Sequence, residues 1–198
     1  MHGMDFTKSL CEKITPLVEP LSHHINLNVF GYRRFFPDGT CFKTSSNFEW
    51  DKFVQEKFND MIIPSYENEV RSVLKDKKRY FLRIGEPDPQ DIFLSTLYDL
   101  DIWNTLSLYE KNENFVEGFY ITSTRENYKI VSEYFNNLDL FVNFSHYFKD
   151  KIGDIISRQE MKKASSLAIP PKIFEEYSIK TNLNKRHIQG DSTYGSKH

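Results

Sequence analysis

The pattern of apolar and polar positions predicts a β-hairpin in the first quarter of the chain. Residues 25–29 alternate apolar and polar side chains, and the strand pattern continues to residue 36. A period of two is typical of a strand with one buried face. Pro37, Asp38 and Gly39 then indicate a turn, because an Asp-Gly pair adopts the positive φ angles that a tight hairpin needs. The chain is expected to return as a second strand over residues 40–44.

Apolar residues at helical spacing predict helices before and after this hairpin. The first covers residues 6–19, and Pro16 and Pro20 lie where they should weaken or stop it. The next begins after Ser46 or Asn47, because either side-chain oxygen can accept a hydrogen bond from a free backbone N–H of the first turn. Weaker patterns over residues 67–77 and 92–100 are compatible with two more helices.

The second half of the chain is expected to form three strands and one long helix. The strands are predicted over residues 80–84, 103–109 and 115–122. Ser123 and Glu126 match a capping box, which would open a helix over residues 124–157. The apolar face of this helix is broader than one sheet can cover, so a second layer must cover the rest. That layer is either another subunit or the amino-terminal helix.

This order of elements predicts an α+β fold. We expect an αβα sandwich with a central antiparallel sheet of about five strands, similar in plan to PAS and GAF sensor domains. The chain has 198 residues, enough for one sizeable domain with or without a tail. The domain is predicted to span residues 1–157 and to end in the long helix. Residues 158–198 are interpreted as a polar linker or tail.

Composition and charge narrow the possible functions. Residues 1–157 hold 18 basic and 24 acidic residues, whereas residues 158–198 hold eight and four. An acidic body without a basic stripe argues against direct nucleic-acid binding by this domain. No stretch approaches the roughly 20 apolar residues of a membrane helix, and the amino terminus lacks a signal pattern. With only two cysteines, Cys11 and Cys41, the chain is expected to be cytoplasmic, with no membrane partner.

No catalytic or metal-binding pattern is evident in the sequence. It contains no H-E-x-x-H or C-x-x-C spacing and no glycine-rich phosphate loop. His23 and His24 are adjacent, so in a strand they would point to opposite faces and be poor co-ligands. His146 lies among aromatic residues and is interpreted as a packing histidine. We therefore expect no enzyme activity, no cofactor and no metal ion.

The unusual content of aromatic residues, 15% of the chain, leaves a ligand pocket as an alternative to a filled core. Alternation places Tyr32 and Arg34 on one face of the first strand, Trp103 and Ser107 on one face of the fourth, and Phe119 on the fifth. Arg34 or Ser107 among aromatic rings would orient a ligand. A solvated sheet face, with Arg34 lying along it, would explain the same residues.

Three segments resemble the amino-terminal sensor half of LuxR-type bacterial transcription regulators, similar to those of Legionella-like bacteria. They are residues 30–39, 48–50 and 127–156, and the likeness covers roughly residues 20–170. The resemblance implies an αβα sandwich that binds a small apolar signal, often an acyl-homoserine lactone. It also implies a homodimer, and promoter DNA bound only through a carboxy-terminal helix-turn-helix domain. That domain is missing before His198, so we expect the chain to be the sensor half of a longer protein.

The resemblance supports Tyr32 and adds two residues, Trp50 and Asp60, to the candidate site. By position, Tyr32 and Trp50 resemble pocket aromatics of the family, and Asp60 stands where the family has an acidic ligand for the lactone amide. The candidate ligand-binding residues are Tyr32, Arg34, Trp50, Asp60, Trp103, Ser107 and Phe119. The long helix is the expected dimer surface, through Phe135, Leu138, Phe141, Phe144, Phe148 and Ile152.

Together these observations predict a ligand-sensing and dimerisation domain that controls an attached DNA-binding domain. Two alternatives stay open. One is an interaction module with a filled core, which regulates by dimerisation without a ligand. The other is an enzyme on a PAS- or GAF-like scaffold, which would need a polar cleft with convergent acids or histidines.

Overall fold

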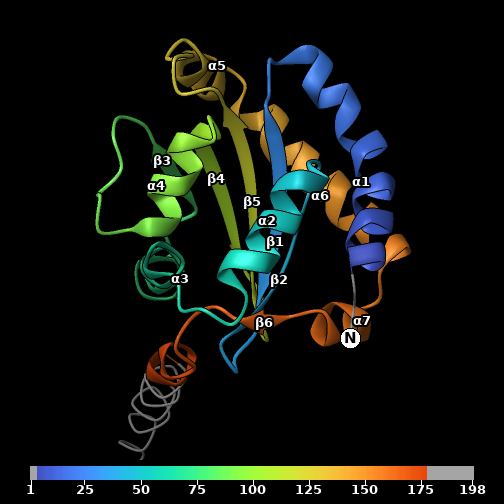
Figure 1. Cartoon of the computed structure of the whole chain (residues 1–198), viewed down its shortest axis with the longest axis vertical. Coiled ribbons are helices and arrows are strands. Elements are labelled where there is room, and N and C mark those ends of the chain that lie inside the picture. The colour runs from blue at the N-terminus through green and yellow to red at the C-terminus, as the bar shows by residue number, and fades with distance from the viewer. Residues whose placement is uncertain (1–3, 178–198) are drawn as a thin grey trace, which may run out of the picture.

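The structure is a computed structural model and describes residues 4–177 of the chain (Figure 1). The strands are β1 (Val29–Phe35), β2 (Thr40–Ser45), β3 (Tyr80–Arg83), β4 (Trp103–Lys111), β5 (Val116–Ser123) and β6 (Ser166–Leu167). The helices are α1 (Met4–His24), α2 (Phe48–Phe58), α3 (Pro64–Asp76), α4 (Ile92–Asp99), α5 (Ile130–Asn136), α6 (Leu138–Ile155) and α7 (Arg158–Lys163).

Helices cover both faces of one antiparallel sheet, whose strand order is β3-β4-β5-β1-β2-β6 (Figure 1). Apolar side chains of α1, α5, α6 and α7 pack on one side, which we call the α6 face. Those of α2, α3 and α4 pack on the other side, the α2 face. The expected α+β sandwich is confirmed, with six described strands in place of about five.

Most of the predicted strands and helices are confirmed. The hairpin forms as β1 and β2, and the strands expected in the second half form as β3, β4 and β5. Asn47 caps α2, because its side-chain oxygen accepts a 2.9 Å hydrogen bond from the backbone N–H of Trp50. The weaker helical patterns correspond to α3 and α4. Helix α3 begins with Pro64 and ends at Asp76, and the next residue, Lys77, has a left-handed φ of 55° that stops the helix.

The turn of the β1–β2 hairpin needs glycine for two reasons. Gly39 has a φ of 80°, a conformation that side chains disfavour, and a Cβ atom there would overlap the backbone carbonyl of Ile169. We expect Gly39→Ala to destabilise the fold by about 2 kcal/mol or more, because strain and steric overlap add.

Gly85→Ala is the matched control for this prediction. Gly85 has nearly the same φ, 77°, but nothing lies within 4 Å of the position of a Cβ atom. Only the backbone strain remains, so the expected loss is about 1 kcal/mol. Chemical denaturation of both variants measures the difference. Equal losses would show that the overlap with Ile169 does not contribute.

Helix α1 is longer than the sequence predicts. Pro16 and Pro20 lie inside it, and the helix continues to His24 rather than stopping near residue 19. Its buried side, which includes Ile14 and Val18, packs on the α6 face of the sheet. Tertiary packing therefore offsets the backbone hydrogen bonds that each proline removes.

The single long helix predicted over residues 124–157 is wrong. Residues 124–129 are outside helices, and two helices, α5 and α6, follow with a break at Asn137. The capping box does not form at Ser123, which belongs to β5. Instead, Asn104 donates hydrogen bonds to the backbone carbonyls of Thr124 and Arg125, at 2.8 and 2.9 Å, and holds the segment in a turn.

The surface expected to form a dimer interface is mostly interior. Phe141, Phe144, Phe148 and Ile152 are buried in the core of the α6 face, where α1 lies against α6. These four residues are therefore not available to a second subunit. Leu138 is partly buried against the same core, and Phe135 is 69% exposed. Within one chain, the amino-terminal helix supplies the second layer over α6.

The packed structure continues beyond the expected boundary at residue 157. Ser157 and Glu160 form a capping box that opens α7. The chain then adds β6 to the edge of the sheet beside β2 and passes to the α2 face, where Ile169 and Ile173 are fully buried. Residues up to Phe174 are thus part of the core rather than a linker. The rest of the predicted tail, residues 178–198, lies outside the described residues.

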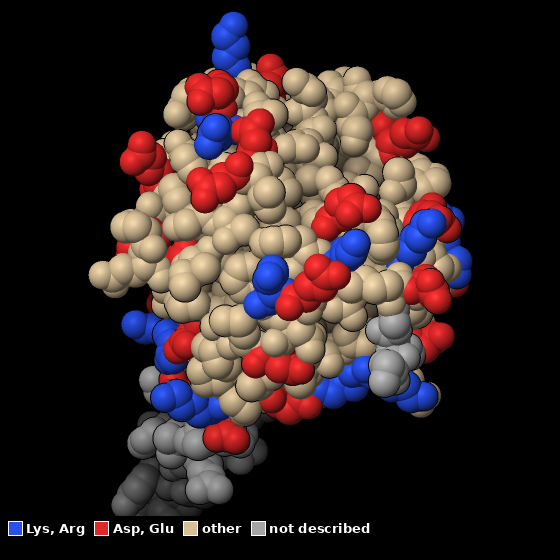
Figure 2. Space-filling view, viewed as in Figure 1, with Lys and Arg blue, Asp and Glu red and all other residues tan. Residues whose placement is uncertain are grey.

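Charged residues of both signs are interspersed on the face of the molecule drawn in Figure 2, without a continuous basic area among the described residues there. Over the described part of the chain, every helix is too short or too polar to cross a bilayer. Cys11 and Cys41 are both buried, reduced thiols.

Candidate ligand-binding site

The sheet separates the residues that the sequence groups into one site. Tyr32 and Phe119 lie in the core of the α6 face, and Trp50 and Trp103 lie in the core of the α2 face. The four rings are therefore not gathered at one point: Tyr32 and Trp50 line a common cavity, described below, and Trp103 and Phe119 do not.

Tyr32 and Arg34 do meet, as alternation predicts: Arg34 Nε donates a 3.0 Å hydrogen bond to the Tyr32 hydroxyl, and a carboxylate binds both residues. Arg34 Nη2 lies 2.7 Å from Glu117 Oε1, and the Tyr32 hydroxyl donates a hydrogen bond to the same oxygen. Asn112 Nδ2 donates to the other oxygen of Glu117 at 3.1 Å. The glutamate is buried, and its polar atoms are satisfied within the protein. This cluster is therefore a structural network rather than a ligand contact.

Three other candidates, Trp103, Asp60 and Ser107, lie in surroundings that do not form a ligand site. Trp103 Nε1 donates a 2.7 Å hydrogen bond to the backbone carbonyl of Gly85. Asp60 is exposed, and its carboxylate accepts a 3.0 Å hydrogen bond from the backbone N–H of Leu167 in β6. Ser107 is buried, and its hydroxyl has no hydrogen-bond partner. None of the three lines the cavity described next.

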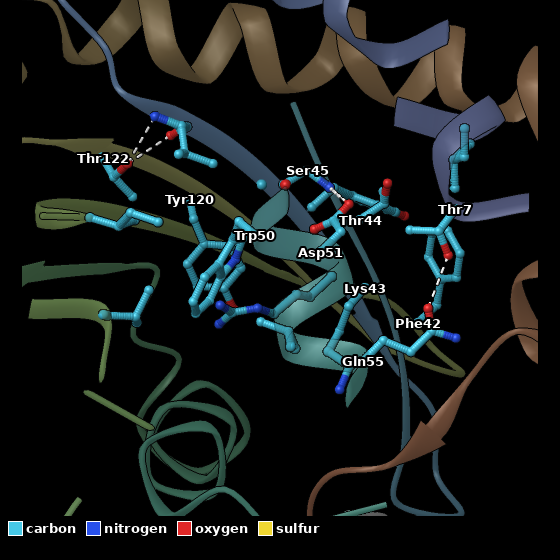
Figure 3. Close-up of a pocket in the computed structure, with 18 of the residues that line it drawn as sticks. Thr7, Phe42, Lys43, Thr44, Ser45, Trp50, Asp51, Gln55, Tyr120 and Thr122 are labelled. Atoms are coloured by element: carbon cyan, nitrogen blue, oxygen red, sulfur yellow. Dashed lines mark hydrogen bonds between the residues drawn. The ribbon is translucent and has the colours of Figure 1, made fainter. Parts of the chain in front are cut away.

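A cavity of about 100 Å³ lies where α1 and α2 meet β1, β2 and β5 (Figure 3). Figure 3 shows side chains from these elements converging on it. Of the seven predicted ligand-binding residues, Tyr32 and Trp50 contribute to its lining. A hydrogen bond of 3.2 Å from Thr7 to Gln55 links α1 to α2 beside it. Its volume is below the ~150 Å³ of an engineered cavity that accepts benzene, so it has room only for a molecule, or part of one, smaller than benzene.

Arg33 is the most unusual residue of the cavity lining. Its side chain is sandwiched between two aromatic rings, with the guanidinium carbon 3.5 Å from the ring centre of Tyr120 and 4.0 Å from that of Tyr66. Arg33 is only 8% exposed, and its Nη1 atom has no hydrogen-bond partner. The rings stabilise the cation and fix its position, but they leave a strong donor unused.

Lys43 is a second buried cation at the same place. It lies directly opposite Arg33 in the β1–β2 register, and its Nζ atom is buried without a hydrogen-bond partner. Loss of hydration lowers the pKa of this lysine, and the nearby charge of Arg33 acts in the same direction. Among the described residues, neither cation has a carboxylate within ion-pair distance.

A network of polar groups holds the hydroxyl of Tyr120 and so fixes its ring. Its hydroxyl lies 2.6 Å from that of Tyr109, which in turn donates to Glu69. Glu69 also forms an ion pair with Arg83. Burial raises the pKa of both tyrosines, so their hydroxyls stay protonated at neutral pH. The network therefore fixes one of the two rings that hold Arg33.

Asp51 is the acidic residue of the cavity lining. Its Oδ2 atom accepts a 2.7 Å hydrogen bond from the backbone N–H of Ser45. Burial raises the pKa of this carboxyl group from its usual 3.8 to about 6. Because the raised pKa means that the folded state binds the proton more tightly, ionisation of Asp51 destabilises the fold as the pH rises from about 4 to above 6.

We therefore expect Asp51→Asn to increase the free energy of unfolding at pH 7 by about 2–3 kcal/mol relative to the unmodified chain. Asparagine keeps an oxygen acceptor for Ser45 but carries no charge. The gain should shrink as the pH falls and vanish below about pH 3, where the aspartate is protonated in both the folded and the unfolded state. Urea denaturation of the two proteins across this pH range tests the prediction, and a gain that does not vary with pH would contradict it.

The sequence interpretation missed Arg33, Lys43, Asp51, Tyr66 and Tyr120. A usable signal was present in the predicted hairpin. A turn at residues 37–39 pairs residue 33 with residue 43, so two basic side chains face each other on the side opposite Arg34. Like charges directly opposite each other in a sheet are destabilising, so such a pair indicates that a group of opposite charge binds nearby.

Other chemistry is not indicated by the described residues. They contain no group of three or more His, Cys, Asp and Glu side chains placed to hold a metal ion. Neither a scan against protein-family models nor a search of curated proteins returns a match for this sequence.

Proposed function

We propose that this chain is a small-molecule sensing domain, the sensor half of a LuxR-type bacterial transcription regulator that acts in the cytoplasm. The observation that carries the proposal is the cavity between α2 and the sheet, whose lining includes Arg33 and Lys43, two cations with buried donor atoms that have no hydrogen-bond partner. A core that served packing alone would leave neither the space nor the unused donors.

The position of the cavity supports a mechanism by population shift. Helix α1 contributes to the cavity lining and also packs against α2 and α6. A ligand that binds better to one packing of these helices stabilises that packing. The change is then transmitted to the outer surface of α6 and to any domain attached to the chain.

Homodimerisation is the second part of the proposal. Exposed apolar side chains occur on α5 and α6 and just before α5, and they favour contact with a second copy of the chain. They are Tyr128, Phe135, Leu140 and Tyr147. This observation also supports the alternative, an interaction module that dimerises without a ligand.

Native mass spectrometry of the purified chain tests ligand binding. We expect a reproducible extra mass that is lost on denaturation, or a rise in melting temperature with some members of a small-molecule library. The matched variant is Gly31→Val. A Cβ atom at Gly31 would meet its nearest neighbours at 3.7 Å, an ordinary contact, and the rest of the valine would occupy the cavity.

Gly31→Val should therefore fold normally and lose the bound mass or the melting shift. An apo mass and no melting shift in either protein would contradict the sensing function. A ligand that binds both proteins equally would show that the cavity is not the site.

A further inference from the structure

This inference rests on the proposed function and concerns the chemical class of the ligand. It starts from the two cations of the cavity lining. Arg33 and Lys43 stand directly opposite each other on neighbouring antiparallel strands, on the same face of the sheet. Residues so paired have Cβ atoms only about 5 Å apart, so the two charges repel each other. Burial strengthens that repulsion, because little water is present to screen it.

Neither cation is paired with a carboxylate of the described residues. Among the described residues, neither side chain forms an ion pair, and Arg33 Nη1 and Lys43 Nζ lack hydrogen-bond partners. The other charged groups in contact with the cavity are already engaged. Arg83 is paired with Glu69, and Asp51 accepts a hydrogen bond from Ser45.

The charged side chains of the lining that form no ion pair therefore carry a net charge of plus one. Arg33 and Lys43 contribute two positive charges, and Asp51 contributes one negative charge at neutral pH. A buried cation without a partner is costly, so a fold that keeps two of them side by side gains by binding an anion there. One negative charge on the ligand balances the surplus.

The shape of the site favours a carboxylate. The guanidinium group of Arg33 lies between the rings of Tyr66 and Tyr120, with its carbon 4.0 and 3.5 Å from their centres. A guanidinium edge presents parallel N–H donors that match the two oxygens of a carboxylate. Trp50, Val54 and other apolar side chains line the cavity around it. They suit the uncharged remainder of a small ligand.

We propose that the ligand of this domain is a small organic monoanion whose carboxylate binds between Arg33 and Lys43, with its apolar part in the cavity beside Trp50. The unused donors of the two cations then acquire their acceptor. The repulsion across the β1–β2 pair is replaced by attraction on both sides of the carboxylate, which couples binding to the stability of the sheet.

Acetate is the minimal probe, because it carries the carboxylate and fits the cavity whatever the rest of the ligand. Acetamide is its neutral counterpart of nearly equal shape. The experiment records the melting temperature of the full chain in rising concentrations of each, at constant ionic strength. We expect acetate to raise the melting temperature in a saturable way and acetamide to leave it unchanged.

Lys43→Met and Lys57→Met form the matched pair of variants. Both remove one lysine charge, but Lys57 is exposed in the last turn of α2 and does not line the cavity. Lys43→Met removes a buried, unpaired charge, so the variant should fold. It should weaken acetate binding by about tenfold or more, whereas Lys57→Met should bind acetate as the unmodified chain does.

The outcomes separate this inference from the proposed function. Equal effects of acetate and acetamide, or equal acetate binding by both variants, would overturn the carboxylate assignment. Preferential stabilisation by inorganic phosphate, lost in Lys43→Met, would also overturn it in favour of a phosphate group. In each case, a bound mass that Gly31→Val removes would leave the sensing function standing.

Discussion

Replacing Glu117 with alanine is expected to lower the free energy of unfolding by about 3–5 kcal/mol, one of the largest effects of any single substitution in this chain. The carboxylate is 3% exposed and accepts hydrogen bonds from Tyr32, Arg34 and Asn112. Its removal leaves the Arg34 guanidinium, which is 13% exposed, without its counter-charge. The cost arises mainly from that uncompensated buried charge.

Glu176→Ala is the matched control. Glu176 also pairs with an arginine, Arg71, at 2.6 Å, but its side chain is 42% exposed. Water replaces such a partner readily, and Arg71 keeps a second carboxylate in Glu67. The expected loss is therefore below about 1 kcal/mol. Urea denaturation of both variants at neutral pH makes the comparison. Similar losses would show that burial does not set the strength of the Arg34 pair.

The hairpin and the alternation along its strands could be predicted from sequence because both are local. Gly39 and Asp38 fix the turn, and the turn fixes which residues face each other. The same alternation correctly places Tyr32 and Arg34 on one face. It could not show that Glu117 would bind both of them, because that contact depends on the pairing of β1 with β5.

The helix expected from Ser123 failed because a long-range contact overrides a local pattern. A Ser-x-x-Glu spacing is sufficient to cap a helix, but β5 extends through Ser123, and Asn104 binds the backbone just beyond it. The same spacing at Ser157 and Glu160 does form a capping box, because no other element competes for that backbone. The same Ser-x-x-Glu sequence therefore caps a helix in one place and not in the other, depending on its tertiary contacts.

The candidate site was missed for a related reason. Sequence patterns of aromatic residues indicate burial but not which face of the sheet receives them, so Trp50 and Phe119 were grouped although the sheet separates them. The chemically distinctive feature is two cations without partners, which is a property of the assembled structure. Only the pairing of Arg33 with Lys43, which follows from a turn at residues 37–39 but was not considered, could have indicated it from the sequence.

Phe148→Ala tests whether the buried side of α6 belongs to the core of one chain or to an interface between two chains. Phe148 is fully buried, and its ring lies 4.8 Å from that of Phe30 and 5.6 Å from that of Tyr32. Removing it leaves a cavity among aromatic rings, so we expect a loss of about 3–5 kcal/mol in the free energy of unfolding. Because the contacts lie within one chain, the loss should not depend on protein concentration.

Phe135→Ala is the opposite case on the neighbouring helix. Phe135 is 69% exposed, so its removal should change the stability of the monomer by no more than about 0.5 kcal/mol. If the outer side of α5 and α6 is the dimer surface, the same substitution should weaken self-association in analytical ultracentrifugation. A concentration-dependent loss in Phe148→Ala would return α6 to the interface. Unchanged self-association in Phe135→Ala would show that the outer side of α5 is not part of the dimer interface, because the exposed ring would then contribute neither to stability nor to association.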